Sequence, residues 1–488
     1  MEVSDVILCD VVIIGSGNAG FSAAIAAKEV DPSLHVLLLE KAPESWAGGN
    51  SAFTAGAYRT VFSGLEDLLP IVSNVPHAAA ADKNENENDD DDNLIGRLDV
   101  SPYTEDDFMN DLKRLTNGRT DPALARELVQ ASNETTKWLA KNGVNFQLSF
   151  NRQAYQIDGR FKFWGGMVLS VVDGGKGLIK NHRDAASRLG VEVRRKEDGS
   201  VFEVRAAGGV ILCAGGFEAN PEMRAQYLGP GWDKAYVRGT PFNTGELLKA
   251  AIATTDARPF GNWSGCHSTC WDANAPGGAD AGDQTLTNQL TKSGYPLGLM
   301  INVEGRRFVD EGLDLRNYTY AKFGREILQQ PDNVCFQVWD AHGASWLREE
   351  EYGDDVVVDK VRANTIAELA HKLAARGLRG VAAFEETIAN YNRATNWACP
   401  IIKPPFVAVK VTCGITFTFG GLKVDPGTSA VISHFTNAPI PGLFCAGEML
   451  GGLFYDNYPG GSGLTAGAVF GRKAGDAAAR RALTGVDG

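Results

Sequence analysis

The sequence lacks dense cysteines, long apolar runs and basic clusters, and each lack excludes a class of protein. Eight cysteines among 488 residues cannot form the dense framework of a disulfide-stabilised secreted domain, so we expect reduced thiols in a cytoplasmic protein. The longest apolar runs are only as long as a strand, which predicts no membrane span. The acidic N-terminus reaches its first strand within ten residues, so we expect no secretory signal.

The negative charge of the chain is unevenly distributed. The net charge is −13, and residues 81–93 contribute −6 of it, because they hold seven acids and one lysine. An acidic chain without a basic patch argues against binding to nucleic acid or to an anionic membrane surface. The acidic run has almost no apolar residues, so we predict a disordered insert over 78–98, a solvated loop without a function of its own.

One cluster raises the alternative of a metal site. Cys266 and Cys270 flank His267 at a spacing that could suggest a ligand set. No second ligand pair accompanies them, and two thiols alone cannot close a tetrahedral site. We therefore predict no metal.

Local patterns predict an α/β chain. Residues 9–17 are a continuous apolar run, which is typical of a strand buried in a parallel sheet. A helical pattern of small residues over 19–29 and a second buried strand over 34–41 complete one βαβ unit. A helix is predicted over 121–142, with Asp121 as its cap and a proline in its first turn.

The second half of the sequence reads as an inserted domain followed by a return to the first. We predict two strands and a glycine turn within 201–220, and an α/β insertion over 232–410. The insertion holds strands over 297–303 and 333–339 and helices near 364–376 and 383–393. The chain closes with strands over 411–425 and 442–449 and a small-residue helix over 464–483. The simplest arrangement is one domain made of two outer segments, with another domain between them.

The first strand–helix turn carries a dinucleotide-binding pattern, made of Gly15, Ser16, Gly17, Asn18, Ala19 and Gly20. The first glycine makes the turn, the second lets the backbone approach a pyrophosphate, and the third lets helix and strand pack closely. The helix N-terminus supplies amides and a positive dipole end. Glu40 ends the next strand, where its carboxylate can accept ribose hydroxyls, and a tight turn without a ligand would not explain it.

Nicotinamide and flavin dinucleotides both carry a pyrophosphate, and other segments favour the flavin. A polar, glycine-rich loop follows Glu40, which a nicotinamide-binding domain does not need. The candidate residues there are Lys41, Gly49, Asn50, Ser51, Thr54 and Gly56. Near the C-terminus, Glu448 can bond ribityl hydroxyls. The amides of Ser462, Gly463 and Leu464 would face the flavin N1–C2=O edge and stabilise the charge of the reduced ring. The predicted cofactor is FAD.

Long stretches resemble the fumarate reductase and succinate dehydrogenase flavoprotein superfamily, and within it the FAD-dependent tricarballylate dehydrogenases. They include EKAPESWAGGNSAFTAGAYR, GGFEANPEMRAQYLGPGWD, NVEGRRFVDEG and NYPGGSG, and the resemblance covers nearly the whole chain. It implies a Rossmann-like FAD-binding domain over 1–257 and 411–488, with an inserted α+β capping domain over 258–410. The loop GGNSAFTAG lacks the histidine that tethers flavin in some members, which implies noncovalent FAD.

The resemblance also implies site residues for a small carboxylate substrate, whose carbon exchanges hydride with flavin N5. Arg316 would move the proton, although an arginine pKa above about 12 requires lowering unless the group acts mainly as an acid. The alternative for Arg316 is a surface ion pair. His267 and Arg238 match carboxylate ligands, with a structural histidine and a packing ion pair as alternatives. Further implied flavin contacts are Ala214, Gly215 and Asn243.

The chain departs from the fumarate reductase pattern at the substrate. Thr416 and Phe417 stand in the segment where that family has a histidine, and Tyr458 stands where it has an arginine. A tyrosine donates one hydrogen bond but cannot form a bidentate charged fork, so fumarate itself is a poor candidate. Glu246 adds bulk beside the flavin loop. The segments after residues 195 and 395 are shorter than in the family, which leaves open whether the protein is active.

The leading hypothesis is oxidation of a saturated carbon pair flanked by carboxylates, as in tricarballylate. The same chemistry on another acid or an enone, a flavin-dependent isomerase and a degenerate flavin-binding protein are the alternatives. The sequence has no ferredoxin-type CxxC run and no haem motif, so the electron acceptor is an unidentified partner or oxygen.

Overall fold

The computed structural model describes residues 6–75, 92–194, 202–276, 280–314, 316–356, 359–394 and 399–485. They form two compact units. The first comprises Met1–Gly216, Gly245–Gly265 and Phe419–Gly488, and the second comprises Phe217–Thr244 and Cys266–Thr418. The predicted boundaries differ from these units chiefly at residues 217–244. That segment joins the second unit, where β11 (Tyr236–Val237) pairs with β16 (Phe406–Leu422).

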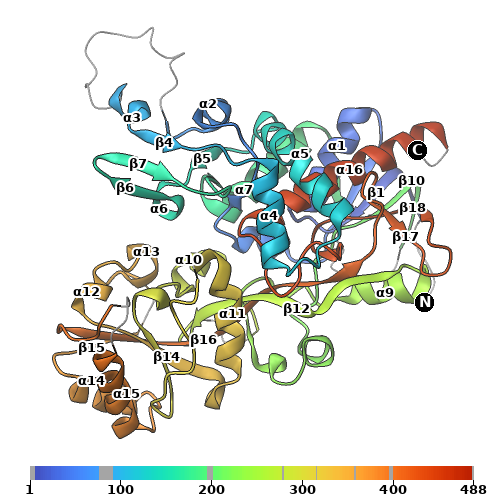
Figure 1. Cartoon of the computed structure of the whole chain (residues 1–488). Coiled ribbons are helices and arrows are strands. Elements are labelled where there is room, and N and C mark those ends of the chain that lie inside the picture. Colours follow the sequence, from blue (N-terminus) through green and yellow to red (C-terminus); the bar gives the residue numbers. More distant parts are fainter. Residues whose placement is uncertain are drawn as a thin grey trace. The chain divides into compact units, whose positions relative to one another are not determined.

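The first unit is built on a six-stranded sheet (Figure 1). Its order is β17 (Ala430–Ile432), β18 (Pro439–Cys445), β10 (Glu203–Leu212), β1 (Val6–Ile14), β2 (Val36–Leu39) and β9 (Glu192–Arg194). All neighbours are parallel except β17 and β18. Val11 and Ile13 in β1 are fully buried, as the apolar run predicts for a sheet covered on both faces. The α/β fold class is confirmed.

The first and last helices pack against each other in this unit. Figure 1 shows α16 (Ser462–Thr484, red) beside α1 (Asn18–Val30, blue). A Cβ placed on Gly471 would lie 2.5 Å from the Ala19 carbonyl oxygen, and one on Gly475 would lie 2.1 Å from the Ala23 oxygen. Only glycine fits these contacts, so the small residues of the C-terminal helix serve this close crossing.

The remaining elements of the first unit are short sheets, flanking helices and single turns. The strands are β3 (Ala57–Tyr58), β8 (Leu169–Val171) and β5 (Phe146–Leu148), then β4 (Leu98–Val100), β7 (Arg160–Phe163) and β6 (Ala154–Ile157). The helices are α2 (Leu65–Leu68), α3 (Asp92–Gly96), α4 (Glu105–Leu115), α5 (Pro122–Lys141), α6 (Phe150–Gln153), α7 (Gly174–Arg188) and α9 (Glu246–Thr254). The predicted cap of α5 is observed, since the Asp121 carboxylate accepts from the Ala123 and Leu124 amides at 2.9 and 3.1 Å.

Two local predictions need correction. The pattern over 201–220 predicted two strands, but one strand, β10, runs through both glycines. A Cβ on Gly209 would lie 2.1 Å from the Gly442 carbonyl oxygen, so this glycine allows close packing within the sheet and does not end a strand. The disordered insert was predicted to extend to residue 98, but regular structure starts earlier, because α3 begins at residue 92 and β4 at residue 98. Residues 76–91 lie outside the described part of the chain.

The second unit contains a mixed sheet with helices around it. β16 runs through its centre, with β11, β14 (Val334–Trp339), β12 (Pro259–Asp272) and β15 (Lys360–Ala363) paired to it and β13 (Leu299–Asn302) paired to β14. The helices are α8 (Pro221–Met223), α10 (Thr287–Leu290), α11 (Arg316–Leu328), α12 (Ala341–Ala344), α13 (Glu349–Tyr352), α14 (Ile366–Ala374) and α15 (Val381–Arg393). One apolar core includes Leu299, Phe336, Leu369 and Phe384.

Three findings concern cysteines, membrane spans and metal ligands. All eight cysteines are free thiols, and all except Cys399 are buried. In the described ranges, every helix is too short or too polar to cross a bilayer. Those ranges also hold no group of three or more metal-ligating side chains arranged for an ion.

Candidate dinucleotide and substrate sites

The turn between β1 and α1 has three glycines with different surroundings. Gly15 has a φ of +110°, and a Cβ on it would lie 2.3 Å from the Cys213 carbonyl oxygen. A Cβ on Gly20 would lie 1.9 Å from the Gly15 oxygen, so the protein itself requires both glycines. A Cβ on Gly17 would meet nothing closer than the Ser51 hydroxyl at 3.5 Å. The protein leaves this space beside Gly17, as close approach of a ligand to the backbone requires.

Glu40 follows β2 and is held against the turn. Its Oε2 accepts from the Ser16 amide at 3.1 Å and from the Ser16 hydroxyl at 2.5 Å, while Oε1 accepts from the Ala42 amide at 2.7 Å. Each carboxylate oxygen can accept two hydrogen bonds, so among the described residues Oε1 keeps capacity for a ribose hydroxyl. The sequence prediction for Glu40 is compatible with this geometry.

The glycine-rich loop after Glu40 is tied back to the same turn. The Gly48 amide donates to the Ser16 hydroxyl at 3.1 Å, and the Asn18 amide donates to the Ser51 hydroxyl at 3.0 Å. Predicted residues on this loop and its 3-10 turn η2 (Gly49–Phe53) are Gly49, Asn50, Ser51, Thr54 and Gly56. Lys41, predicted in the same segment, forms an exposed ion pair with Glu246 on α9.

The C-terminal segment brings a second set of predicted residues to the start of α1. Glu448 lies in the 3-10 turn η9 (Gly447–Met449), and the Ala214 amide donates to the Met449 sulfur at 3.2 Å. A Cβ on Gly447 would lie 2.9 Å from the Ala19 Cβ. The structure therefore groups Ala214 and Glu448 with the glycine turn, and Gly215 follows Ala214 with a φ of +77°.

Two long helices begin at this group with a glycine at the N-cap, and the Asn18 amide at the start of α1 is bonded to the Ser51 hydroxyl. α1 has Gly17 and α16 has Gly461 at the N-cap, and neither glycine supplies a capping oxygen. Amides in the first turn of a helix have no partner within the helix, so such ends favour anionic groups. Ser462, Gly463 and Leu464 form the first turn of α16, as predicted. A pyrophosphate at α1 and an electron-rich flavin edge at α16 fit these donors.

A buried network that the sequence did not reveal joins the two helix ends. The Asn18 side-chain amide donates to the Leu464 carbonyl oxygen at 2.8 Å. Its oxygen Oδ1 accepts from the Tyr58 hydroxyl at 2.9 Å and from His182 Nε2 at 3.0 Å. Burial lowers the pKa of His182 to about 3, so the imidazole is neutral and carries its proton on Nε2. Tyr58 lies 40 positions and His182 164 positions from Asn18, and no local pattern marks them as its partners.

Arg59 is a second residue that sequence reasoning missed. Its guanidinium donates from Nε to the Gly460 carbonyl oxygen at 2.9 Å and from Nη1 to Asp111 and the Tyr103 hydroxyl at 2.6 and 2.7 Å. Its side chain is buried. Because the partner glycine lies 401 positions away, only the folded chain shows that Arg59 holds the loop before α16.

Two of the predicted carboxylate ligands lie in the second unit. His267 on β12 is buried, and its ring lies 5.6 Å from the Phe417 ring. Burial lowers the pKa of His267 well below 6.5, and the Arg238 charge lowers it further, so this imidazole is neutral near pH 7. A neutral imidazole can donate a hydrogen bond to a carboxylate, and its burial is equally what the alternative of a structural histidine requires.

Arg238 and Asn243 are held by contacts within the same unit. Arg238 Nε donates to the Thr291 hydroxyl at 3.0 Å, and its guanidinium lies 5.8 Å from the Trp271 ring centre. The Asn243 side chain donates to Glu218 Oε1 at 2.6 Å and is buried. Asn243 is therefore bonded within the second unit.

The other predicted catalytic residues are placed differently. Arg316 begins α11, but its side chain lies outside the described part of the chain. Tyr458 belongs to the first unit, where its ring lies 5.5 Å from Phe454 and 6.5 Å from Phe419. The structure thus brings Arg238 and His267 together in one unit and surrounds Tyr458 with aromatic rings in the other.

Known proteins share this architecture. A family model described as an FAD binding domain matches residues 10–83 and 176–464. The chain belongs to this FAD-binding family. The probable fumarate reductase Ifc3 of Shewanella frigidimarina is 26% identical and covers 97% of this chain and 75% of the relative. A urocanate reductase of Eggerthella lenta is 25% identical, covering 96% of this chain and 74% of the relative.

A solved structure agrees with the sequence relatives. The open conformation of a flavocytochrome c3 fumarate reductase aligns with a TM-score of 0.68 at 24% identity, covering 99% of this chain and 79% of that one. The solved structure shows the shared fold, and the relatives support the predicted resemblance to the fumarate reductase and succinate dehydrogenase flavoprotein superfamily. The protein is an FAD-dependent oxidoreductase that acts on CH–CH groups. Bound FAD supplies N5 as the hydride donor or acceptor.

Proposed function

We propose that the protein transfers hydride between flavin N5 and a carbon pair of a small carboxylate, with tricarballylate as the favoured substrate. The observation that carries this proposal is that Arg238 lies in the same unit as a neutral, buried His267, near enough for its charge to lower the pKa of His267. A guanidinium and a neutral imidazole N–H are both donors, and a carboxylate is the group that accepts from both. The names of the relatives, a fumarate reductase and a urocanate reductase, support an acid as substrate.

Each predicted residue has a distinct role in this proposal. Arg238 holds a substrate carboxylate as a charged fork, and His267 donates a further hydrogen bond without adding charge. Arg316 exchanges the proton on the carbon next to the one that exchanges hydride. Tyr458, which belongs to the first unit, stays a predicted hydrogen-bond donor. A tricarboxylate presents enough acceptors for all of these donors.

A second candidate substrate is an acid with an aromatic or apolar tail. The rings of Phe419, Phe454 and Tyr458 lie 5.5 to 6.5 Å apart, within the range of favourable aromatic contact. An aromatic tail packs against such rings, whereas a second carboxylate loses water there without gaining a cation. This observation supports an unsaturated acid or enone other than the tricarballylate pair as the second candidate.

The test is a substrate panel with FAD-loaded protein and an artificial electron acceptor. Tricarballylate, succinate and 3-phenylpropionate are supplied in turn, and reduction of the acceptor is followed. Turnover with tricarballylate supports the proposal, and turnover with 3-phenylpropionate alone supports the second candidate. Product without any change of the flavin spectrum would show an isomerase, and no turnover with any acid would overturn both substrate assignments.

A further inference from the structure

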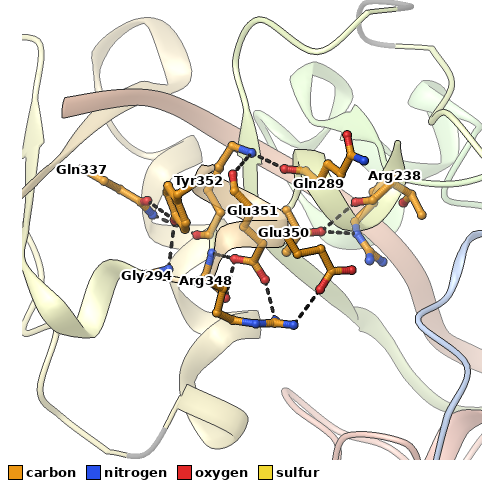
Figure 2. Close-up of polar contacts among 12 residues, drawn as sticks. Arg238, Gln289, Gly294, Gln337, Arg348, Glu350, Glu351 and Tyr352 are labelled. Carbon is orange, nitrogen blue, oxygen red and sulfur yellow. Dashed lines mark hydrogen bonds and ion pairs between the residues drawn. The ribbon is translucent and has the colours of Figure 1, made fainter. Parts of the chain in front are cut away.

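Residues 291–294 form a short irregular segment of the second unit. Each of these residues makes hydrogen bonds to other parts of the unit, several of which Figure 2 draws. The segment follows the single-turn helix α10 and precedes η7 (Tyr295–Leu297). Thr291 pairs with Trp271 as an isolated antiparallel bridge. Irregular segments usually satisfy their polar groups with water, but this one meets buried protein partners at successive residues.

Lys292 anchors the segment in the interior. Its side chain has no exposed surface, and its ammonium donates to the Glu351 carbonyl oxygen at 2.9 Å and to the Gln289 carbonyl oxygen. The Asp272 carboxylate, equally buried, lies 3.7 Å from the ammonium. The Lys292 amide donates to the Cys270 carbonyl oxygen at 3.0 Å, so both backbone and side chain are bonded to buried groups.

The next two residues are bonded to α13. The Ser293 amide and hydroxyl both donate to Glu351 Oε2, at 2.8 and 2.6 Å, and Glu351 Oε1 accepts from Arg348 at 2.7 Å. The Gly294 amide donates to the Tyr352 hydroxyl at 2.9 Å. Figure 2 shows these contacts as one connected set that extends to Arg238.

Thr291 connects this set to Arg238 with a defined polarity. Its hydroxyl lies 3.1 Å from the Thr287 carbonyl oxygen, to which it donates, and 3.0 Å from Arg238 Nε. A hydroxyl has one proton, so the Nε–H of Arg238 must donate to the remaining lone pair. Because a guanidinium is planar, a bond at Nε fixes the plane in which its two Nη groups lie.

We propose that Thr291 is a positioning residue that sets the Arg238 guanidinium in place for a carboxylate, and that the buried Lys292 contacts hold Thr291. Holding a ligand-binding side chain in its binding geometry reduces the entropy lost when the ligand binds. The part of this inference that concerns substrate rests on the proposed role of Arg238. The part that concerns the orientation of Arg238 does not.

The first test needs no substrate. FAD-loaded wild-type, Thr291→Val and Thr291→Ser proteins are treated with phenylglyoxal, and modification of Arg238 is followed by peptide mass spectrometry. Arg238 should react several-fold faster in Thr291→Val and at the wild-type rate in Thr291→Ser, while the exposed Arg362 reacts equally in all three. An unchanged Arg238 rate in Thr291→Val, or loss of protection in Thr291→Ser, overturns the inference.

The second test separates this inference from the proposed function. With tricarballylate, Thr291→Val should raise KM about tenfold while kcat changes much less, since one hydrogen bond to a charged group is lost. Thr291→Ser should restore KM. If Arg238→Lys leaves KM unchanged, Arg238 does not bind the substrate carboxylate. In that case only the rate of Arg238 modification by phenylglyoxal tests whether Thr291 orients Arg238. If Arg238→Lys raises KM and Thr291→Val does not, Thr291 has no positioning role.

Discussion

The side-chain amide of Asn18 donates a 2.8 Å hydrogen bond to the carbonyl oxygen of Leu464, a residue 446 positions later. This bond joins the first turn of α1 to the first turn of α16. The two helix ends are the ones expected to face the pyrophosphate and the flavin ring, so their relative position sets the length of cofactor that fits. The side-chain oxygen of Asn18 is held in turn by Tyr58 and His182.

Replacing Asn18 with leucine should therefore weaken FAD binding. The variant keeps the size of the side chain but leaves the Tyr58 hydroxyl and the Leu464 carbonyl without this partner, and a lost buried hydrogen bond costs about 1–3 kcal/mol. We expect the Kd for FAD, measured by flavin fluorescence titration, to rise about tenfold. Asn390→Leu on the exposed face of α15 is the matched control. If Asn18→Leu binds FAD with wild-type affinity, the hydrogen bond between Asn18 and Leu464 does not contribute to FAD binding.

Glu40→Gln tests the adenosine end of the same site. The glutamine keeps the shape but replaces one acceptor oxygen by a donor amide, so the contacts with Ser16 or Ala42 and a ribose hydroxyl cannot all be kept. We expect a Kd for FAD raised about tenfold, with an unchanged KM for substrate once FAD is saturating. Glu44→Gln, an exposed neighbour, should bind FAD normally. Equal affinities for the two variants would contradict the assignment of Glu40.

Lys292→Met should destabilise the second unit strongly. The substitution leaves Asp272 buried beside an apolar side chain, and removing one partner of a buried pair costs about 3–5 kcal/mol. Lys372→Met makes the same change in an exposed pair with Glu368 on α14, where water screens the charges and the expected loss of stability is much smaller. Chemical denaturation of both variants measures the difference. Similar stabilities would mean that the Lys292 contacts contribute little to this unit.

The neutral His182 predicts a pH dependence of stability. Its pKa of about 3 in the folded protein lies below the usual value of 6.5, so between these values only the unfolded chain binds the proton. Stability should therefore fall as pH falls from 6.5 toward 3, with a contribution from this group of about 1.4 kcal/mol per pH unit. His182→Gln keeps a side-chain amide that can donate to Asn18 but does not titrate.

Denaturation midpoints measured at several pH values provide the check. The slope of unfolding free energy against pH should be smaller in His182→Gln than in wild type by one proton over this range. His267 is also held neutral by burial, and it contributes the same pH dependence of stability in both proteins. Parallel slopes for the two proteins would show that His182 is charged in the folded state.

The sequence predicts the parts of this structure that local patterns encode. The glycine turn, the strand ending at Glu40 and the capped helix α5 depend on residues close together in the chain, and each is found where predicted. The prediction of two strands within 201–220 was wrong. Gly209 packs closely against the backbone of Gly442, and the sequence around Gly209 gives no sign of that distant contact.

The site was predictable to a similar extent. Side chains that would contact the cofactor through a recognised motif could be named from the sequence. The residues that support them could not, because Arg59 bonds to Gly460 and Thr291 to Arg238 across long stretches of chain. A lysine such as Lys292, fully buried in the structure, looks in the sequence like any solvated surface lysine.

The most direct measurement mixes substrate with the FAD-loaded protein under anaerobic conditions and records the visible flavin spectrum. Tricarballylate should bleach the oxidised flavin band and yield the unsaturated acid, and addition of the unsaturated acid to the reduced protein should restore the band. If neither the tricarboxylates nor any acid of the panel changes the flavin band in either direction, hydride transfer to a carboxylate carbon pair is not the activity of this protein.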